Sequence, residues 1–579
     1  MSKDEIIAVL ENIARLLEIK GENPFKVRAY TNAARALETL TEPLEKLIKE
    51  DRLGSVNGLG KATSEKITAL VRDGRLDYYD HLSDEFPPDI LSLFEIHGLG
   101  AKKIKALWDA LRIHSITKLE RACQSGKVAG LPGFGEKTAA NILQAIGHHK
   151  KHVGEFRLGD IAGLAESLLD DLRNHPDVTR ARIAGSYRRQ KEIVRDLDFI
   201  VSSRHPEGVS EFFAAHPLVE SVLARGATKT SVILKSGIQC DLRVVTGPEF
   251  PFALAYFTGS KEHNVRIRSR ALARGWSLNE YRFSAAEGRD LKEPLPEIRE
   301  ENDIYTALGL EPVVPELRED RGEIEAAEAH RLPQLIEWQN LRGTFHNHTT
   351  ESDGRATLED MAAAARELGM EYLGIADHSK ASFQARGLDE KRLAAQVARV
   401  RELGDGSLQL FAGTECDILK DGTLDFPDDI LASLDYVVAS VHSSFTLSEA
   451  EMTKRIIRAI SNPYVTMLGH LTGRLLLTRE AYRVNVPAVI EAAAETGTII
   501  ELNANPRRLD MDWRWWPLAK EKGVKCSINP DAHSTNGLQD LVFGIGAARK
   551  GWLTKADVIN TLPLQQVTAV LAAKRARAS

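Results

Sequence analysis

The chain has 579 residues, too many for one hydrophobic core, so several domains are expected. Hydrophobic residues make up 43% and charged residues 27%, which is typical of a globular protein in water and argues against a disordered or membrane-embedded chain. The net charge of -6 neither favours nor excludes nucleic acid, because local patches of charge decide binding.

Two further features of the sequence bear on location. No stretch approaches the roughly 18 consecutive apolar residues that cross a membrane, and the first residues hold no apolar signal core. Widely spaced cysteines fit neither a disulfide frame nor a thiolate zinc motif; they are Cys123, Cys240, Cys416 and Cys526. We therefore expect a cytoplasmic protein that has no contact with a membrane.

The hydrophobic pattern predicts a multidomain α/β protein. Residues 1 to about 150 have the pattern of short helices between glycine-rich turns, and short strand-like runs begin near Arg182. An acidic, proline-containing stretch, Glu311–Glu328, predicts a linker. From Arg342 onward, strand-like runs alternate with alanine-rich helices, which predicts a β/α architecture.

A glycine-containing turn occurs three times in the first 150 residues. Val56–Gly60, His97–Gly100 and Leu131–Gly135 each precede a helical run that contains lysine. A Gly-x-Gly turn at the start of a helix directs backbone N–H groups outward, which makes a site for phosphate. Three ordinary helix connections are the alternative, but the repetition favours helix-hairpin-helix elements that bind the DNA backbone without reading its sequence.

An Asp-x-Asp pair follows in a predicted strand. Asp196 and Asp198 share one face because side chains alternate along a strand, and Asp241 supplies a third carboxylate from a neighbouring predicted strand. Such carboxylates can bind two Mg²⁺ ions, one for the primer 3′-hydroxyl and one for the triphosphate.

A phosphate motif precedes this pair. Gly185 and Ser186 offer N–H groups and a hydroxyl before a predicted helix, and Arg189 adds positive charge. A lone Asp-x-Asp is more often a capped strand end. Together with this motif and a third aspartate, it predicts a nucleotidyltransferase.

The segment Tyr256–Arg268 closely resembles the sugar- and base-contacting segment of the family X DNA polymerases, as does Leu278–Tyr281. The resemblance implies that Tyr256 and Phe257 crowd the sugar 2′ position, that Asn264 meets the incoming base and that Arg268 lies on the template side. The nucleotide contacts it implies are Tyr256, Phe257, Gly259, Asn264 and Arg268. The alternative is that the segment holds only an aromatic pair in a core and a basic helix face. That alternative does not explain why all these residues occur in the family's order.

The resemblance also covers the N-terminal domain, where Lys66 takes the position of the family's lyase lysine. Lys26 and Tyr30 resemble two supporting positions. A lyase lysine attacks the C1′ aldehyde of an abasic sugar phosphate and forms a Schiff base. The alternative is a solvated helix lysine that touches phosphate.

Two residues depart from the family motif. Gln190 stands where the motif usually has glycine, and Arg195 stands where glycine often precedes the first aspartate. Because glycine allows close approach of the backbone, these changes predict a reshaped triphosphate pocket and an altered rate, with the reaction type retained.

Histidine and carboxylate residues recur after strand-like runs in the C-terminal half. His346-x-His348 puts two imidazoles on one face, and the other candidates follow successive predicted strands, whose ends would meet at one mouth. A single histidine after a strand is usually structural, but chance explains five or six such positions poorly.

The set resembles the polymerase and histidinol phosphatase (PHP) phosphoesterases from Gly343 to about Gly551. The resemblance implies a distorted β/α barrel and a trinuclear centre of Zn²⁺, Mn²⁺ or Fe, with Asp377 supporting His378. In this centre a metal-bound hydroxide would be the nucleophile. The ligands it implies are His346, His348, Asp353, His378, Glu415, His442, His470, Asp531 and His533.

The domain order expected from these motifs is that of bacterial family X polymerases with a C-terminal PHP domain. The predicted ranges are a helix-hairpin-helix DNA-binding and lyase-like domain 1–90, a fingers-like hairpin subdomain 91–150, a palm 151–245, a thumb 246–315, a linker 316–341 and a PHP domain 342–579. The resemblance implies gap filling in DNA repair with 3′–5′ exonuclease, 3′-end processing and cutting at abasic sites. It also implies gapped, nicked or primer–template DNA and deoxynucleoside triphosphates as partners of a monomer.

Two other functions remain open from the sequence. The first is a metallophosphatase for small molecules whose N-terminal half only binds DNA. The second is a DNA-end binding scaffold with weak catalysis. The intact Asp196, Asp198 and Asp241 favour the polymerase.

Overall fold

The computed structural model divides the chain into two compact units. The first covers Met1–Val153, and the second covers Gly154–Ser579 apart from Leu477–Arg479. No described helix is both long and apolar enough to cross a membrane. The residues that the structure describes are 1, 3–38, 40, 44–56, 58–96, 98–151, 154–289, 294–404 and 406–577.

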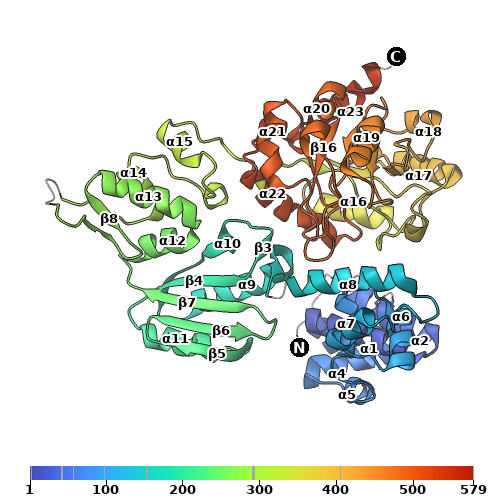
Figure 1. Ribbon diagram of the computed structural model, residues 1–579, viewed down its shortest axis with the longest axis horizontal. Coiled ribbons are helices and arrows are strands. Elements are labelled where there is room, and N and C mark those ends of the chain that lie inside the picture. The colour runs from blue at the N-terminus through green and yellow to red at the C-terminus, as the bar shows by residue number, and fades with distance from the viewer. Residues whose placement is uncertain are drawn as a thin grey trace. The chain divides into compact units, whose positions relative to one another are not determined.

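The first unit is helical, as predicted (Figure 1). Buried leucine and isoleucine side chains from its helices form one core. Its helices are α1 (Lys3–Lys20), α2 (Pro24–Glu38), α3 (Leu44–Lys49), α4 (Lys61–Asp73), α5 (Asp77–Asp84), α6 (Ala101–Leu111), α7 (Ile116–Gln124) and α8 (Gly135–Lys151).

The three predicted hairpin turns share one backbone conformation. Gly58, Gly98 and Gly133 have φ angles of 92°, 85° and 84°, in the left-handed region that favours glycine. Two predicted turn residues, Asn57 and His97, lie outside the described residues. Gly60 and Gly100 are the N-caps of α4 and α6, so the N–H groups of both helix starts follow directly on the turns.

The second unit begins with a palm-like sheet whose strand order is β2-β4-β7-β6-β5 (Figure 1). β4 and β7 are parallel neighbours, and the other pairs in this sheet are antiparallel. Its elements are β1 (Phe156–Arg157), α9 (Leu158–Asn174), β2 (Val178–Ile183), α10 (Gly185–Arg188), β3 (Ile193–Val194), β4 (Asp196–Ser203), α11 (Pro206–Ala214), β5 (Val219–Arg225), β6 (Lys229–Leu234) and β7 (Gln239–Val245).

The side chains of β4 alternate between two apolar clusters. Leu197, Phe199 and Val201 pack in the core that also contains residues of α9 and α11. Ile200 packs on the opposite face, against Phe250 of the next helix, α12 (Phe250–Thr258). This alternation puts the aspartates of β4 on the α12 face of the sheet.

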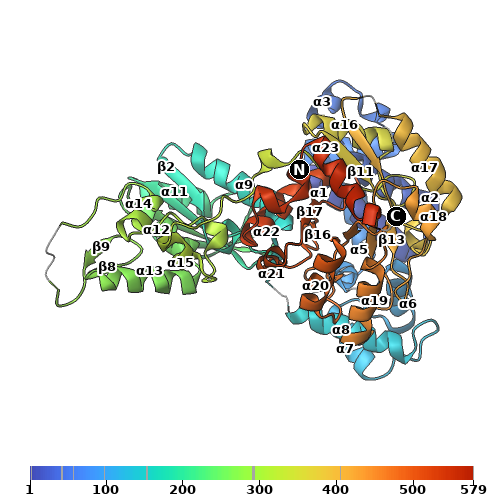
Figure 2. The ribbon, with the colours of Figure 1, turned by 90° about the horizontal axis from the view of Figure 1, so that it is seen from above.

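A thumb-like helical region follows, with its own core. β8 and β9 form an antiparallel pair beside α13 (Figure 2). Part of the predicted linker belongs to this core through Leu317, Ile324 and Leu335. Besides α12, the elements are α13 (Lys261–Ala273), β8 (Trp276–Leu278), β9 (Phe283–Ala285), α14 (Glu301–Ala307) and α15 (Glu323–Glu328).

The C-terminal part alternates strands and helices, as predicted. The strands are β10 (Gly343–Thr344), β11 (Tyr372–Ile375), β12 (Gln409–Ala412), β13 (Glu415–Asp417), β14 (Val438–Ser440), β15 (Met467–Leu468), β16 (Ile499–Asn503) and β17 (Cys526–Asn529). The helices are α16 (Leu358–Glu367), α17 (Glu390–Glu402), α18 (Asp428–Ala432), α19 (Glu449–Ile460), α20 (Val486–Thr496), α21 (Trp516–Glu521), α22 (Leu541–Lys550) and α23 (Leu564–Ala573).

These strands form two parallel sheets, β10-β11-β12 and β13-β14-β15-β16-β17. Single parallel bridges, His378–Glu415 and Asn347–Ala532, connect the two sheets. Within the described residues these single bridges join the two sheets and no continuous ladder closes them; the resemblance implied a distorted β/α barrel, not a continuous one. Buried Tyr436 fills space between the strands, because Gly374 and Gly413 carry no side chain and a Cβ at either would lie 2.5 Å from its ring or hydroxyl.

Candidate functional sites

The three predicted polymerase carboxylates lie on two adjacent strands. Asp198 of β4 and Asp241 of β7 are register partners in a parallel pair, and Asp196 lies two residues before Asp198 on the same face. Hydrogen bonds orient Asp241, since Gln239 Nε2 donates to its Oδ1 at 3.1 Å and Lys229 Nζ lies 3.3 Å from its Oδ2. The structure thus brings these carboxylates together on one face of two neighbouring inner strands.

The electrostatics of this carboxylate group suit a cation. Burial, together with the charges of Asp196 and Asp241, raises the pKa of Asp198 to about 7. Burial and the charge of Asp241 likewise raise the pKa of Asp196. Carboxylates that repel one another in this way are stabilised by divalent ions, and oxygen ligands are those that Mg²⁺ prefers.

The phosphate motif lies directly beside the carboxylates. Gly185 begins the short helix α10 with a φ of 63°, and a Cβ there would lie 2.5 Å from Asp198 Oδ2. Only glycine therefore fits this position. Ser186 is half-buried in the same turn, and the Arg189 guanidinium donates through Nη1 to the carbonyl oxygen of Thr258. A Cβ on Gly259 would lie 3.1 Å from Arg189 Nη1, so these two predicted residues are also neighbours.

The predicted nucleotide segment forms one end of α12 and the start of α13. Tyr256, Asn264 and Arg268 line one pocket, and Asn264 Nδ2 donates to the Tyr256 carbonyl oxygen at 2.7 Å. Phe257 is outside this lining: its ring lies 5.1 Å from that of Tyr256 and 4.0 Å from the Arg243 guanidinium carbon.

The two departures from the family motif have distinct positions. Gln190 adopts a φ of 54°, so its backbone keeps the left-handed conformation that glycine would favour. Arg195 is 77% exposed and pairs with Glu155 at 2.5 Å between Nη2 and Oε1.

In the first unit, Lys66 lies on α4 beside two stacked tyrosines. Its Nζ is 4.9 Å from the ring centre of Tyr78 and 5.7 Å from that of Tyr30. Lys26 lies 5.8 Å from the same Tyr78 ring. The three residues that the sequence grouped as lyase-like are therefore brought together around Tyr78, which the sequence did not single out.

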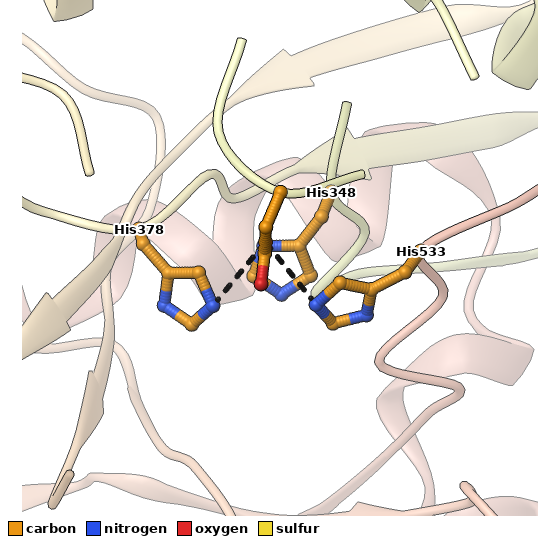
Figure 3. Close-up of side chains that lie close together, drawn as sticks. His348, His378 and His533 are labelled. Atoms are coloured by element: carbon orange, nitrogen blue, oxygen red, sulfur yellow. Dashed lines mark ion pairs between the residues drawn. The ribbon is translucent and has the colours of Figure 1, made fainter. Parts of the chain in front are cut away.

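The nine histidine and carboxylate residues predicted in the C-terminal half converge on one site. Figure 3 shows the His348, His378 and His533 rings close together. Asp353 Oδ1 lies 3.6 Å from His378 Nε2 and 3.3 Å from His533 Nε2. Buried Glu415 forms the second centre of contacts. Its carboxylate oxygens lie within 2.8 to 3.7 Å of nitrogens of His346, His348, His378, His442 and His470.

Asp531 completes the set, with Oδ1 3.2 Å from His348 Nε2 and 3.8 Å from His346 Nε2. Three overlapping groups have ligand atoms close enough to share an ion: His348, Asp353, His378 and His533; His346, His348 and Glu415; and His378, Glu415 and His442. Each ligand follows or ends a strand of the two parallel sheets, which explains why residues nearly 190 positions apart meet.

The chemistry of these donors fits divalent metal ions. Among the described residues, His346 Nε2, both ring nitrogens of His348 and Glu415 Oε2 are buried without a hydrogen-bond partner. Burial alone would lower the pKa of His442, but Glu415 and Asp417 raise it to about 10. The same buried negative charge attracts metal cations, and mixed imidazole and carboxylate ligands suit transition metals.

Three supporting residues were missed from the sequence. Glu501 accepts from His346 Nδ1 at 2.6 Å, Asp417 lies 3.2 Å from His442 Nδ1, and Arg508 Nε lies 3.3 Å from Asp531 Oδ2. Carboxylates that fix the second nitrogen of a ligand histidine are a regular feature of metal sites. In the sequence, the one feature that could have indicated Glu501 is that it is a charged residue inside an apolar, strand-like run.

Asp377 was expected to support His378, but its carboxylate bonds to other residues. Its carboxylate instead accepts from the Thr349 backbone N–H at 2.8 Å and hydroxyl at 2.7 Å. Ser352 and Gln396 also donate to it. Asp377 therefore fixes the loop that carries His348 and Asp353, because the buried N–H and hydroxyl donors of that loop need an acceptor.

Comparison with known proteins agrees with a helical N-terminal region, a polymerase thumb and a C-terminal PHP domain. Four protein families match the chain: helix-hairpin-helix domain (residues 1–76), SAM-like helix-hairpin-helix tandem (90–147), DNA polymerase beta thumb (253–319) and PHP domain (344–505). The matches confirm the predicted helical N-terminal region, thumb and PHP domain. Both polymerase and PHP families depend on divalent metal ions.

Among curated relatives, DNA polymerase/3′-5′ exonuclease PolX of Bacillus subtilis is 39% identical over 575 residues, 99% of both chains. Rat DNA polymerase lambda is 26% identical over 331 residues, 52% of this chain and 53% of its own. A probable phosphatase of a Thermoanaerobacter species is 29% identical over 227 residues, 37% of this chain and 89% of its own. The match to the Bacillus protein runs through both candidate sites, and it shows that this chain belongs to the family X DNA polymerases that carry a C-terminal PHP domain.

Proposed function

We propose that this chain fills short gaps in DNA by nucleotidyl transfer and removes nucleotides from DNA 3′ ends at its PHP centre. The observation that carries the proposal is that one chain of this family holds two separate groups of metal-ligating residues. One lies on β4 and β7, and the other lies at the strand ends of the PHP domain. We further propose that it acts as a cytoplasmic monomer on gapped, nicked or primer–template DNA.

In the polymerase site, Asp196, Asp198 and Asp241 would hold two Mg²⁺ ions. These ions would lower the charge on the triphosphate and favour the deprotonated primer 3′-hydroxyl. The chain's own residues position the nucleotide. The N–H groups at Gly185 and Ser186 bind triphosphate oxygens, and Arg189 neutralises their charge.

The nucleotide's sugar and base would be positioned by the α12–α13 segment. Tyr256 and Phe257 crowd the sugar 2′ position, and the backbone at Gly259 approaches closely because it carries no side chain. Asn264 meets the base edge, and Arg268 lies toward the template. The hydrogen bond from Asn264 Nδ2 to the Tyr256 carbonyl oxygen, which brings these two residues together, supports this assignment.

In the PHP site, we propose about three Zn²⁺ or Mn²⁺ ions, which would make a hydroxide available at neutral pH for phosphodiester hydrolysis. The protein orients the imidazoles through Glu501 and Asp417, and it excludes bulk water by burial of most ligands. The proposed ligands are His346, His348, Asp353, His378, Glu415, His442, His470, Asp531 and His533.

Gap filling and degradation are tested together on one labelled substrate. With deoxynucleotides and Mg²⁺, a primer beside a one-nucleotide gap should lengthen by one residue; without them and with Mn²⁺, it should shorten. A small-molecule phosphatase is the second candidate, favoured by the 29% identity to the Thermoanaerobacter probable phosphatase. It predicts hydrolysis of phosphomonoesters while the primer keeps its length in both reactions.

We also propose that Lys66 is the nucleophile of a 5′-deoxyribose phosphate lyase. Borohydride should trap a covalent adduct between the protein and an incised abasic site, and Lys66→Ala should reduce trapping by roughly tenfold or more, because the Schiff base needs this amine. The matched control is Lys61→Ala on the same helix, which should leave trapping near the level of the unaltered protein. Undiminished trapping in Lys66→Ala would reject this lysine.

A further inference from the structure

A helix of the PHP domain supports the loop behind the polymerase phosphate motif. Lys550, the last residue of α22, donates from Nζ to the carbonyl oxygen of Arg189 at 3.0 Å. It also donates to Glu319 Oε1 at 2.5 Å. Lys550 is only 1% exposed, so both bonds lie in a dry contact where charged hydrogen bonds are strong.

Glu319 is shared between two cations at this contact. Its Oε1 accepts from Lys550 Nζ and also from Arg189 Nε, at 3.1 Å. Burial alone would raise the pKa of Glu319, but Lys550 and Arg189 hold it below its usual value. Burial lowers the pKa of Lys550 to about 8. One carboxylate therefore balances two positive charges, and removal of either cation leaves it to the other.

Gln190, the departure from the family motif, belongs to the same contact. A Cβ on Gly546 of α22 would lie 2.5 Å from Gln190 Oε1, so this side chain lies directly against the helix backbone. Glu192, two residues after Gln190, accepts through Oε2 from Trp513 Nε1 at 3.2 Å. The loop that follows the phosphate motif is thus held by the PHP domain at three successive points.

We infer that Lys550 is a positioning residue of the polymerase site. By sharing the Glu319 carboxylate with Arg189, it weakens the hold of Glu319 on the guanidinium that the incoming triphosphate needs. The inference rests on the proposed role of Arg189 in nucleotide binding. Without Lys550, the buried Glu319 carboxylate has Arg189 and the more distant Lys191, at 4.0 Å, as its cations. A buried carboxylate holds its remaining partner tightly, because an unpaired charge there is costly. The PHP domain would then set the nucleotide affinity of a site to which it contributes no ligand.

The test is steady-state gap filling by Lys550→Met. We expect the KM for the incoming deoxynucleotide to rise on the order of tenfold, the size of one lost charged hydrogen bond, with kcat changed less than about twofold. The double variant Glu319→Gln, Lys550→Met should return KM to the level of the unaltered protein or below, because the competing charge is gone. Loss of both partners also removes the buried unpaired charge, so the double variant should fold even where the single one does not.

Arg549→Met is the matched control. Arg549 is the neighbouring residue of α22 and pairs across the same interface with Glu316, at 2.6 Å between Nε and Oε1. It should leave the nucleotide KM unchanged. Two results would overturn the inference in favour of general loosening of the interface. One is an equal rise of the nucleotide KM in Lys550→Met and Arg549→Met. The other is a double variant whose KM stays as high as that of Lys550→Met. If the unaltered protein incorporates no nucleotide at all, the proposed polymerase function fails instead.

Discussion

Alanine at Asp196 or Asp241 should lower nucleotide incorporation at a one-nucleotide gap by roughly a thousandfold or more. Each metal ion contributes several kcal/mol of charge stabilisation in phosphoryl transfer, and each 1.4 kcal/mol is about tenfold in rate. Primer degradation without nucleotides should stay within about twofold of the unaltered protein, because the PHP ligands form a separate group. The measurement is single-turnover extension beside degradation on the same labelled primer.

Asp170→Asn is the control for these two variants. Asp170 is an exposed carboxylate on α9 that pairs with Arg173, so its loss should leave both activities unchanged. A folded Asp196→Ala protein that loses extension and degradation together would contradict two independent sites. Full extension by Asp241→Ala would remove this carboxylate from the proposed Mg²⁺ ligands.

The polymerase carboxylates were predictable because strand geometry is local. Asp196 and Asp198 share a face through the two-residue repeat of a strand, which the sequence displays directly. The pairing of β4 with β7 was not given by spacing, but a third aspartate in a strand-like run was a strong enough signal. The structure makes Asp198 and Asp241 direct register partners.

The PHP ligands were predictable for a different reason: most of them follow a strand-like run closely, and Asp353 lies within reach in the loop after His348. The same logic failed for Glu501, which lies inside the apolar strand β16 and contacts His346 from there. It also misplaced Asp377, because neighbours in sequence point in opposite directions on an extended chain. The division of the distorted barrel into two sheets could not be located from the sequence, because strand ends are set by tertiary pairing; β10, at one break, has only two residues.

The contact between α22 and the phosphate motif lay beyond any sequence argument. Lys550 and Arg189 are separated by 361 positions, and neither has a local pattern that points to the other. Gln190 looked like a defect when judged against the family's glycine. In the structure its backbone has a positive φ, which glycine adopts readily, and its side chain lies against Gly546. A departure from a motif can therefore mark a contact with another domain.

Replacement of His348 or Asp531 by alanine should lower 3′–5′ degradation by roughly a thousandfold or more and reduce the metal content of the purified protein. Both side chains are almost fully buried and meet at 3.2 Å, so no surface group can replace them as ligands. A site that lacks one ligand would bind its ion less tightly, and the activation of water that the ion would supply is lost with it. Gap filling should continue near its usual rate.

The measurement that checks this last expectation joins elemental analysis with degradation assays in Mn²⁺, Zn²⁺ and Mg²⁺. His330→Ala is the control, because His330 is 73% exposed and lies outside the cluster; it should keep both metal and activity. A purely structural cluster predicts something else: metal removal would lower the melting temperature, but the intact protein would never shorten a primer. The nuclease is excluded if the purified protein contains metal but hydrolyses neither DNA nor simple phosphoesters with any of the three ions. The ligand set would then serve stability alone.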